Sequence, residues 1–517
     1  MVVFFGRSRR PRPRPPAGFQ TSLAAERLEG RTLLAVTAGL VDGELLISYN
    51  DPGDRVAEIA SDGTNYTVSG TGLWAVQVPI ASVTGRIAVI DLAGVGGQEF
   101  TVAAGAPLAN PLQVTADVEM TRLVAGIDAT VAGTVFIGSP SVSIGSVFST
   151  QPVPVSTSAT NGNVTLSGAV TLTNDAAFAS GAGAIALGSI SAPAALAVFL
   201  GDTNQSGPVT ITGDLSLPLG LMITAAATFD LSLAGAANSI AVSQIDNGGM
   251  LRIGRAGGTS TFRDGLMATA PTGVALAGVI ETVNAPLTLG DVALLADATL
   301  RSGSGAIVTG VVTDGVGSHA LTLGSLTQTG DVTLGGGVTL DGLATAAGDF
   351  GVSLHGAANE IVQQVTFTNT RYVVFGDGTD DVSRFAAGVT ATSQATGSYL
   401  SGTLRTAGGA IDIGGLYLTG ATTLDTSDAG TVATGAPITL RNGARLAGHV
   451  LTTIGGVGGT AQGTYLLGAG DFGSGPTDTG SLEVQAGSLF IGDSATSTAT
   501  LTVANDTSIR IAAGGLI

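Results

Sequence analysis

Apolar residues alternate with small polar residues in short runs that glycines separate. Three runs share one pattern, 162–172, 207–217 and 330–340, with apolar side chains two positions apart in each half. Side chains two positions apart point to the same face of a β-strand. Each run therefore predicts a short strand, a bend at the glycines and a second short strand, with one face buried.

A longer repeat spans the second half of the chain. Gly235 and Gly356 occupy equivalent places in two similar segments 121 residues apart, and Gly310 and Gly435 stand 125 residues apart. The growth of the offset indicates small loop insertions within a duplicated, stackable unit. The two predicted super-repeats are about 207–329 and 330–450.

Stacking of successive rungs is the fold that these strands favour. A strand of three to six residues cannot bury a core alone, whereas coils piled on one another share a continuous apolar interior. We expect an all-β fold in which residues 112–517 form a right-handed parallel β-helix, with small residues rather than aromatic ones filling the narrow coils. The alternative is a row of β-sandwiches, which needs larger aromatic cores and a regular unit of about 90–100 residues.

A different pattern precedes the repeats. Residues 39–111 alternate in longer runs between turn sequences, as in 44–49 before the turn at 50–53. This predicts a small β-meander domain in which Tyr66 and Trp74 anchor the core.

Composition narrows the chemistry that the chain can perform. Charged residues are 11%, glycines number 79, cysteine is absent, and all 20 basic residues are arginine. Disulfides, thiolate metal sites, cysteine nucleophiles, Schiff-base lysines and P-loops are therefore excluded. No apolar run reaches 18 residues, so no transmembrane span is expected.

Charge is distributed unevenly between the head of the chain and its body. Residues 1–31 hold seven arginines and two acids and so carry a net charge of +5. Because the whole chain carries −18, the remaining residues carry −23. Such a body repels nucleic acid and anionic membranes, so no nucleic-acid partner is expected. We expect residues 1–38 to be a disordered Arg/Pro-rich export or targeting segment, with the basic residues acting as an n-region.

A short motif follows the arginines. Leu28, Glu29, Arg31, Leu33 and Leu34 resemble the N-terminal Leu-Glu-Pro-Arg-x-Leu-Leu motif of planctomycete surface and secreted proteins, with glycine in place of the usual proline. The resemblance implies export, to a secreted or cell-surface location, and says nothing of activity. A first amphipathic helix is the alternative interpretation of the same spacing.

The repeat region also resembles the Gly/Thr/Val-rich β-strand repeats of bacterial filamentous adhesins, through its composition over about 400 residues. That resemblance implies a structural or adhesive role.

One segment resembles a calcium-binding nonapeptide repeat. Residues 376–382 contain Gly-x-Gly-x-Asp-x-Val in a single copy, which makes Asp377, Asp380 and Asp381 candidate calcium ligands through their carboxylate oxygens. An acidic turn is the alternative. No other cofactor is expected.

Two functions follow from these observations. The first is a non-catalytic, exported, adhesive β-solenoid that presents polar faces to a cell-surface glycan, matrix or protein. The rival is a carbohydrate-active β-helix enzyme, a polysaccharide lyase or hydrolase. The rival requires Asp380 and Asp381 to converge with Arg371 or Arg384 beside a concavity, because these are the only grouped acids and bases in the array.

Overall fold

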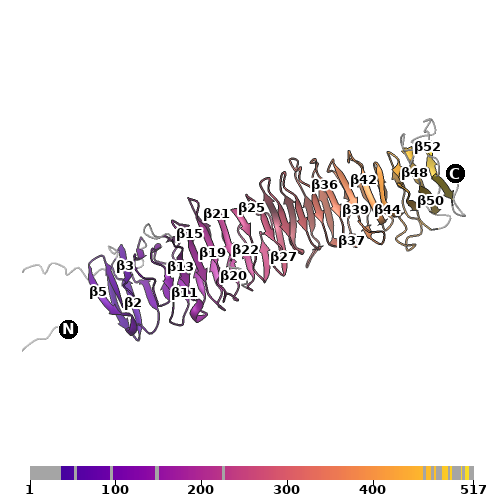
Figure 1. Ribbon diagram of the computed structural model, residues 1–517. Helices are drawn as coiled ribbons and strands as arrows, with labels where there is room; N and C mark the ends of the chain where they lie inside the picture. The colour runs from indigo at the N-terminus through magenta and orange to yellow at the C-terminus, as the bar shows by residue number, and fades with distance from the viewer. Residues whose placement is uncertain are drawn as a thin grey trace, which may run out of the picture.

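Short β-strands stacked along a single axis make up the rod seen in Figure 1. The computed structural model describes residues 36–51, 55–93, 97–145, 151–223, 228–457, 462–466, 471–472, 480–486, 489–491, 502–503 and 507–511. Within these ranges the only helical elements are two 3-10 turns, η1 (Ile80–Ser82) and η2 (Ser158–Thr160). The expected all-β fold is confirmed.

An antiparallel meander covers the N-terminal end of the rod. Its strands are β1 (Val36–Val41), β2 (Glu44–Tyr49), β3 (Val56–Ser61), β4 (Asn65–Gly70) and β5 (Leu73–Pro79). Two of them, β2 and β3, also pair in parallel with the next strands along the rod, β6 (Ile87–Asp91) and β7 (Glu99–Val102). The meander therefore continues directly into the parallel stack, which begins at β6 within the range 39–111.

Each turn of the parallel stack contributes one segment to each of three faces, and the parallel β-helix is confirmed. The first face contains β6 (Ile87–Asp91), β8 (Leu112–Val114), β11 (Val135–Ile137), β14 (Val164–Leu166), β17 (Ile185–Leu187), β20 (Val209–Ile211), β22 (Leu231–Leu233), β24 (Met250–Ile253), the first halves of β27 (Gly273–Thr282) and β29 (Val292–Arg301), β31 (Val312–Thr313), β34 (Val338–Leu340), β37 (Ala358–Ile361), β40 (Val382–Phe385), the second halves of β42 (Ser398–Arg405) and β44 (Leu416–Asp425), β47 (Val450–Ile454), β50 (Gly480–Ala486) and β53 (Thr507–Ile511).

The second face contains β7 (Glu99–Val102), β9 (Met120–Leu123), β12 (Ser141–Ile144), β15 (Ala169–Leu172), β18 (Ile190–Ser191), the first halves of β21 (Leu215–Ile223) and β23 (Ala237–Gln244), β25 (Thr259–Phe262), the second halves of β27 and β29, β32 (Ala320–Leu323), β35 (Gly342–Thr345), β38 (Val365–Thr366), β41 (Val389–Ala391), β43 (Ile411–Ile413), β45 (Ile438–Leu440), β48 (Thr464–Leu466) and β51 (Leu489–Ile491).

The third face contains β10 (Ile127–Asp128), β13 (Val153–Ser156), β16 (Ala176–Ala179), β19 (Ala197–Leu200), the second halves of β21 and β23, β26 (Leu266–Ala268), β28 (Leu287–Leu289), β30 (Ile307–Thr309), β33 (Val332–Leu334), β36 (Gly351–Leu354), β39 (Tyr372–Phe375), the first halves of β42 and β44, β46 (Ala444–Arg445), β49 (Asp471–Phe472) and β52 (Thr502–Val503).

Glycines let some strands pass from one face to the next without a loop. Gly278 lies in the middle of β27 at φ 74°, where the pairing register with β29 shifts. A Cβ built at Gly278 would approach the carbonyl oxygens of Arg255 and Gly258 to 2.5 Å. Both the positive φ and this close approach require glycine at the corner.

The interior is apolar along the described rod, as the alternation predicts. Inward side chains stack rung upon rung, for example Val209, Leu231 and Leu251 on the first face, all fully buried. The expectation that aromatic residues would not fit inside is wrong. Phe367 packs edge-to-face against Phe375 and Phe385, with ring centroids 5.5 and 6.1 Å apart, and all three rings are buried in the interior.

The two predicted anchors of the meander behave differently. Tyr66 is fully buried, and its hydroxyl donates to Asn110 Oδ1 at 2.6 Å. Trp74 is 88% exposed, so its assignment to the core is wrong. Trp74 lies on β5, which is an edge strand because it pairs only with β4 among the described strands. Alternation along an edge strand does not show which of its two faces is packed against the core.

Buried contacts recur between the two halves of the repeat region. Asn247 Nδ2 donates to the carbonyl of Phe229, and Asn369 Nδ2 donates to that of Phe350, each at 3.0 Å. Both asparagines are fully buried. Their offset of 122 residues matches that of the sequence repeat, so the interior hydrogen bonds follow the same duplication.

Candidate functional site

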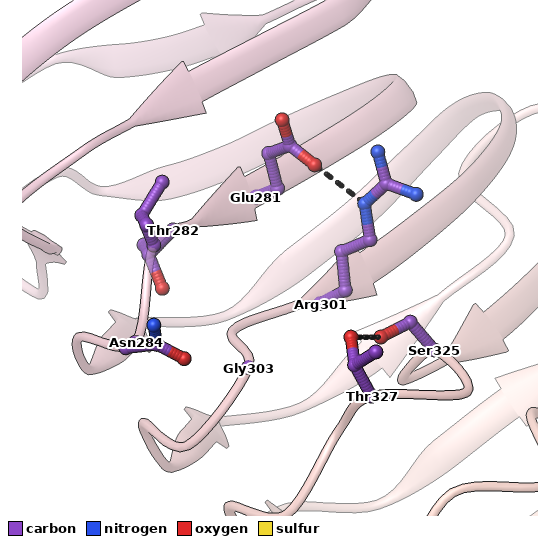
Figure 2. A pocket seen from close by; sticks show the side chains of 8 residues that line it. Glu281, Thr282, Asn284, Arg301, Gly303, Ser325 and Thr327 are labelled. Atoms are coloured by element: carbon purple, nitrogen blue, oxygen red, sulfur yellow. Dashed lines mark hydrogen bonds and ion pairs between the residues drawn. The ribbon is translucent and has the colours of Figure 1, made fainter.

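A pocket of about 320 Å³ opens at the corner between the second and third faces (Figure 2). Three successive turns supply its walls, through the loops that follow β27, β29 and β32. Glu281 and Arg301 come from the ends of β27 and β29, whereas Ser325 and Thr327 come from the loop after β32. The parallel stacking therefore brings together residues about 20 positions apart.

An ion pair forms one side of this pocket. Arg301 Nε lies 2.5 Å from Glu281 Oε2, and Thr261 Oγ1 donates to Glu281 Oε1 at 2.6 Å. Figure 2 shows the two charged side chains turned toward one another. Glu281 is 20% and Arg301 39% exposed, so the guanidinium remains accessible to a ligand.

Fixed polar groups form the opposite side. Asn284 adopts φ 56°, and its Oδ1 accepts a hydrogen bond from the backbone of Ser304 at 3.1 Å. The hydroxyls of Ser325 and Thr327 are 3.2 Å apart. The loops thus present hydroxyl and amide groups that are held by their own contacts before any ligand arrives.

The chemistry of this lining suits binding better than hydrolysis. Glu281 is the one carboxylate among the described lining residues, and it is paired with Arg301. Glycoside hydrolysis ordinarily uses two carboxyl groups on opposite sides of the scissile bond. A guanidinium, a paired carboxylate and several hydroxyls instead resemble the few placed polar groups of a binding site.

A second pocket of about 490 Å³ lies near the meander. Arg86 lines it, donating from Nε to Glu44 Oε2 at 3.1 Å and contacting Gln113 through a terminal nitrogen. The ring of Phe136 forms part of the apolar wall. Its charged groups are again a single mutually paired acid and base.

The calcium candidates lie in the turn after β39. Asp381 is 8% exposed, and its Oδ2 accepts hydrogen bonds from the backbone of Asp377 and Gly378 at 2.8 and 2.7 Å. This carboxylate therefore closes its own turn. Among the residues that the structure describes, no three His, Asp or Glu side chains gather as a metal site would require. Calcium binding by Asp377, Asp380 and Asp381 stays a prediction, which melting with and without a chelator would test.

The arginines that the enzyme hypothesis needs pair with other acids. Arg371 contacts Asp331 at 2.9 Å, and Arg384 contacts Asp428 at 2.9 Å. Hydrogen bonding to Arg384 lowers the pKa of Asp428 below its usual range. Each partner lies two turns away from its arginine, so the pairs could have been found by applying the coil spacing to the charges as well as to the apolar residues.

The residues of the targeting motif, Leu28, Glu29, Arg31, Leu33 and Leu34, lie outside the described residues. The last three positions of the predicted segment 1–38 belong to β1, which pairs with β2. Within the described part of the chain, no helix is long and apolar enough to cross a membrane.

Comparison of the chain with protein-family models, with curated proteins and with solved structures found no match.

Proposed function

We propose that this chain is an exported, non-catalytic adhesive rod that holds polar binding surfaces away from the cell surface. The observation that carries this proposal is the parallel stacking of rungs along the whole described length of the rod (Figure 1). Successive strands in a parallel sheet lie about 4.8 Å apart, so each added turn extends the rod by that distance. A stack of this kind is a stiff spacer with long flat faces.

The distribution of charge supports binding rather than catalysis. Each arginine that forms an ion pair in the described part of the chain contacts one or two acids, and the groups are spread along the rod, for example Glu99 with Arg122 and Asp412 with Arg441. The rival enzyme needs clustered, unpaired carboxylates in a groove. Asp381, its central candidate, instead accepts hydrogen bonds from its own turn.

Export and partners belong to the proposal as well. The basic head and the motif at Leu28–Leu34 support a secreted or cell-surface location, where the partner would be a glycan, matrix component or protein.

Cell fractionation and protease accessibility on intact cells test this secreted or cell-surface location. We expect the rod to be degraded by external protease while a cytoplasmic marker survives. Full protection of the rod in intact cells, with degradation after lysis, would overturn the proposal.

A further inference from the structure

Three of the six tyrosines form a column on the outside of the third face. Tyr372, Tyr399 and Tyr417 lie on the consecutive rungs β39, β42 and β44, in the orange part of Figure 1. The rings of Tyr399 and Tyr417 stack with centroids 5.2 Å apart, and Tyr372 meets Tyr399 edge-on at 6.3 Å. We call these three residues the tyrosine column; each is half-buried.

Glycines beneath the column bring its outer rings close to the backbone. A Cβ at Gly351 would lie 2.1 Å from the Tyr372 ring, and a Cβ at Gly397 would lie 2.4 Å from the Tyr417 ring. Any other residue at these two positions would push the rings away. The column is thus a fixed row of aromatic rings about 10 Å long, at the spacing of parallel strands, in which Tyr399 and Tyr417 stack and Tyr372 stands edge-on.

Paired charges border the column. Tyr372 donates from its hydroxyl to Asp331 Oδ2 at 2.9 Å, and Arg371 contacts the other oxygen of Asp331 at 2.9 Å. At the far end, the guanidinium of Arg445 lies 5.6 Å from the centre of the Tyr417 ring. Hydrogen-bond donors and acceptors therefore stand beside the aromatic rings.

The matching surface in the other super-repeat lacks the aromatic rings, although an ion pair between Arg252 and Asp230 also borders it. The offsets fixed by Asn247/Asn369 and by Gly278/Gly402 align the three tyrosines with Met250, Ala275 and Ala293. The interior hydrogen bonds at Asn247 and Asn369 are nevertheless the same. The packing of the core therefore does not require tyrosines here, and a role at the surface accounts for them.

We propose that the tyrosine column binds a neutral polysaccharide chain. This inference rests on the proposed function, because it names a partner that the rod would hold. A sugar ring offers an apolar C–H face to an aromatic ring and hydroxyls to neighbouring polar groups, and both kinds of partner are present here.

Charge selects among the polymers that could lie on this surface. Arg371 pairs with both Asp331 and Asp349, and Arg445 lies at the other end of the column. Two arginines therefore balance two aspartates, and the border of the column carries little net charge. The rod as a whole is strongly acidic, which repels anionic polysaccharides and nucleic acids. A neutral glycan therefore fits better than a charged one.

Affinity electrophoresis of the full chain tests the inference. The gels would contain hydroxyethylcellulose, galactomannan or laminarin as neutral probes, and alginate as the anionic probe. We expect at least one neutral polymer to retard the protein, and Tyr399→Ala to weaken that binding by about tenfold or more. Tyr399→Phe keeps the ring and is expected to bind normally. Tyr465→Ala, which removes a tyrosine from the second face, is the matched control.

The outcomes separate this inference from the proposed function. Retardation by alginate alone, or equal binding by wild type and Tyr399→Ala, would overturn the inference and leave an adhesive rod possible. If no polymer retards the protein, the inference is also overturned. Protease accessibility on cells tests the proposed function of the rod independently of this result. Should Tyr399→Ala fail to melt like wild type, the tyrosine difference absorption spectrum of the wild type decides. A spectrum unchanged by a polymer that retards the protein places binding elsewhere.

Discussion

Gln205 and Gln328 make the same hydrogen bonds at two different corners of the rod. Their Oε1 atoms accept from the backbone of Ser180 and Ser302, each at 2.8 Å. Their Nε2 atoms each donate to the carbonyl two residues further along, again at 2.8 Å. Gln205 lies between the third and first faces, whereas Gln328 lies between the second and third.

The same displacement applies to the other equivalent positions. Asn238 lies on the second face and Asn359 on the first, yet each bonds from Nδ2 to a serine on the next rung, at 2.9 and 3.0 Å. The path from β22 on the first face to β36 on the third covers five complete turns and two further sides. The second super-repeat is therefore turned by one face relative to the first. The unit of packing is one side of the coil, a strand with its corner, of roughly seven residues.

A pair of deletions tests this conclusion with the largest expected effect. Removing residues 252–373 joins Leu251 to Val374 and preserves the alternation of inward and outward side chains, since Phe375 then takes the inward place of Ile253. We expect this shortened rod to fold, although the deletion does not remove a whole number of turns.

Removing residues 252–372 is the matched control. It joins Leu251 to Val373, two inward residues, and reverses the orientation of Phe375. We expect this chain to lose cooperative melting and to aggregate, as judged by circular dichroism and gel filtration. Equal behaviour of the two deletions would contradict the equivalence of the sides.

Removal of either corner glutamine should destabilise the rod to the same extent. Gln205→Leu and Gln328→Leu each leave buried backbone groups without a partner, at a cost of about 2–3 kcal/mol in the free energy of unfolding. Urea unfolding measures this change, and Gln363→Leu at an exposed site should stay within about 0.5 kcal/mol of wild type. A large effect at only one corner would show that the two networks are not equivalent.

The sequence was sufficient to predict the fold because alternation and glycine spacing depend on local geometry. The alternation in residues 207–217 predicts two short strands with one buried face, and Val209, Ile211 and Leu217 are fully buried there. The rotation of the second super-repeat by one face could not be predicted from the sequence. The offset of 121–125 residues does not say how many sides of the coil those residues form.

The surface groups were harder to predict than the fold. Glu281 and Arg301 meet only because their strands are stacked in register, and the tyrosine column requires the face of each rung to be known. Asp377, Asp380 and Asp381 stood out in the sequence because they are adjacent. Adjacency along the chain says little here, because neighbouring residues on a strand point to opposite faces.

Titration of Tyr372 tests a difference between the two super-repeats, because the second has the tyrosine column and the first has Met250 at the position equivalent to Tyr372. Burial first, and then the hydrogen bond to Asp331, raise the pKa of Tyr372 to about 12. Because the folded pKa lies above the unfolded value of 10, the stabilising contribution is complete below pH 10 and is lost as pH rises toward 12.

Absorbance titration of Asp331→Asn is the measurement. We expect the pKa of Tyr372 to fall toward 10, because the substitution removes the negative charge and weakens the hydrogen bond. Tyr66, whose pKa is also raised to about 12 by burial, serves as an internal control that should not move. An unchanged titration of both tyrosines would mean that Asp331 does not act on Tyr372.

The smallest expected effect concerns a pair of charges that the two super-repeats carry in opposite order. Glu281 and Arg301 correspond, at an offset of 124, to Arg405 and Asp425, whose Nε and Oδ2 atoms are 3.1 Å apart. Glu281→Arg alone would place two arginines side by side and cost about 0.5–1 kcal/mol, whereas adding Arg301→Glu should restore most of the loss. Thermal melting at low and at 1 M salt measures both, and the penalty of the single variant should shrink in salt because the screening length falls to about 3 Å. A double variant as unstable as the single one would show that contacts not shared by the two super-repeats fix the order of the charges. The hydrogen bond from Thr261 to Glu281 is the first such contact to test.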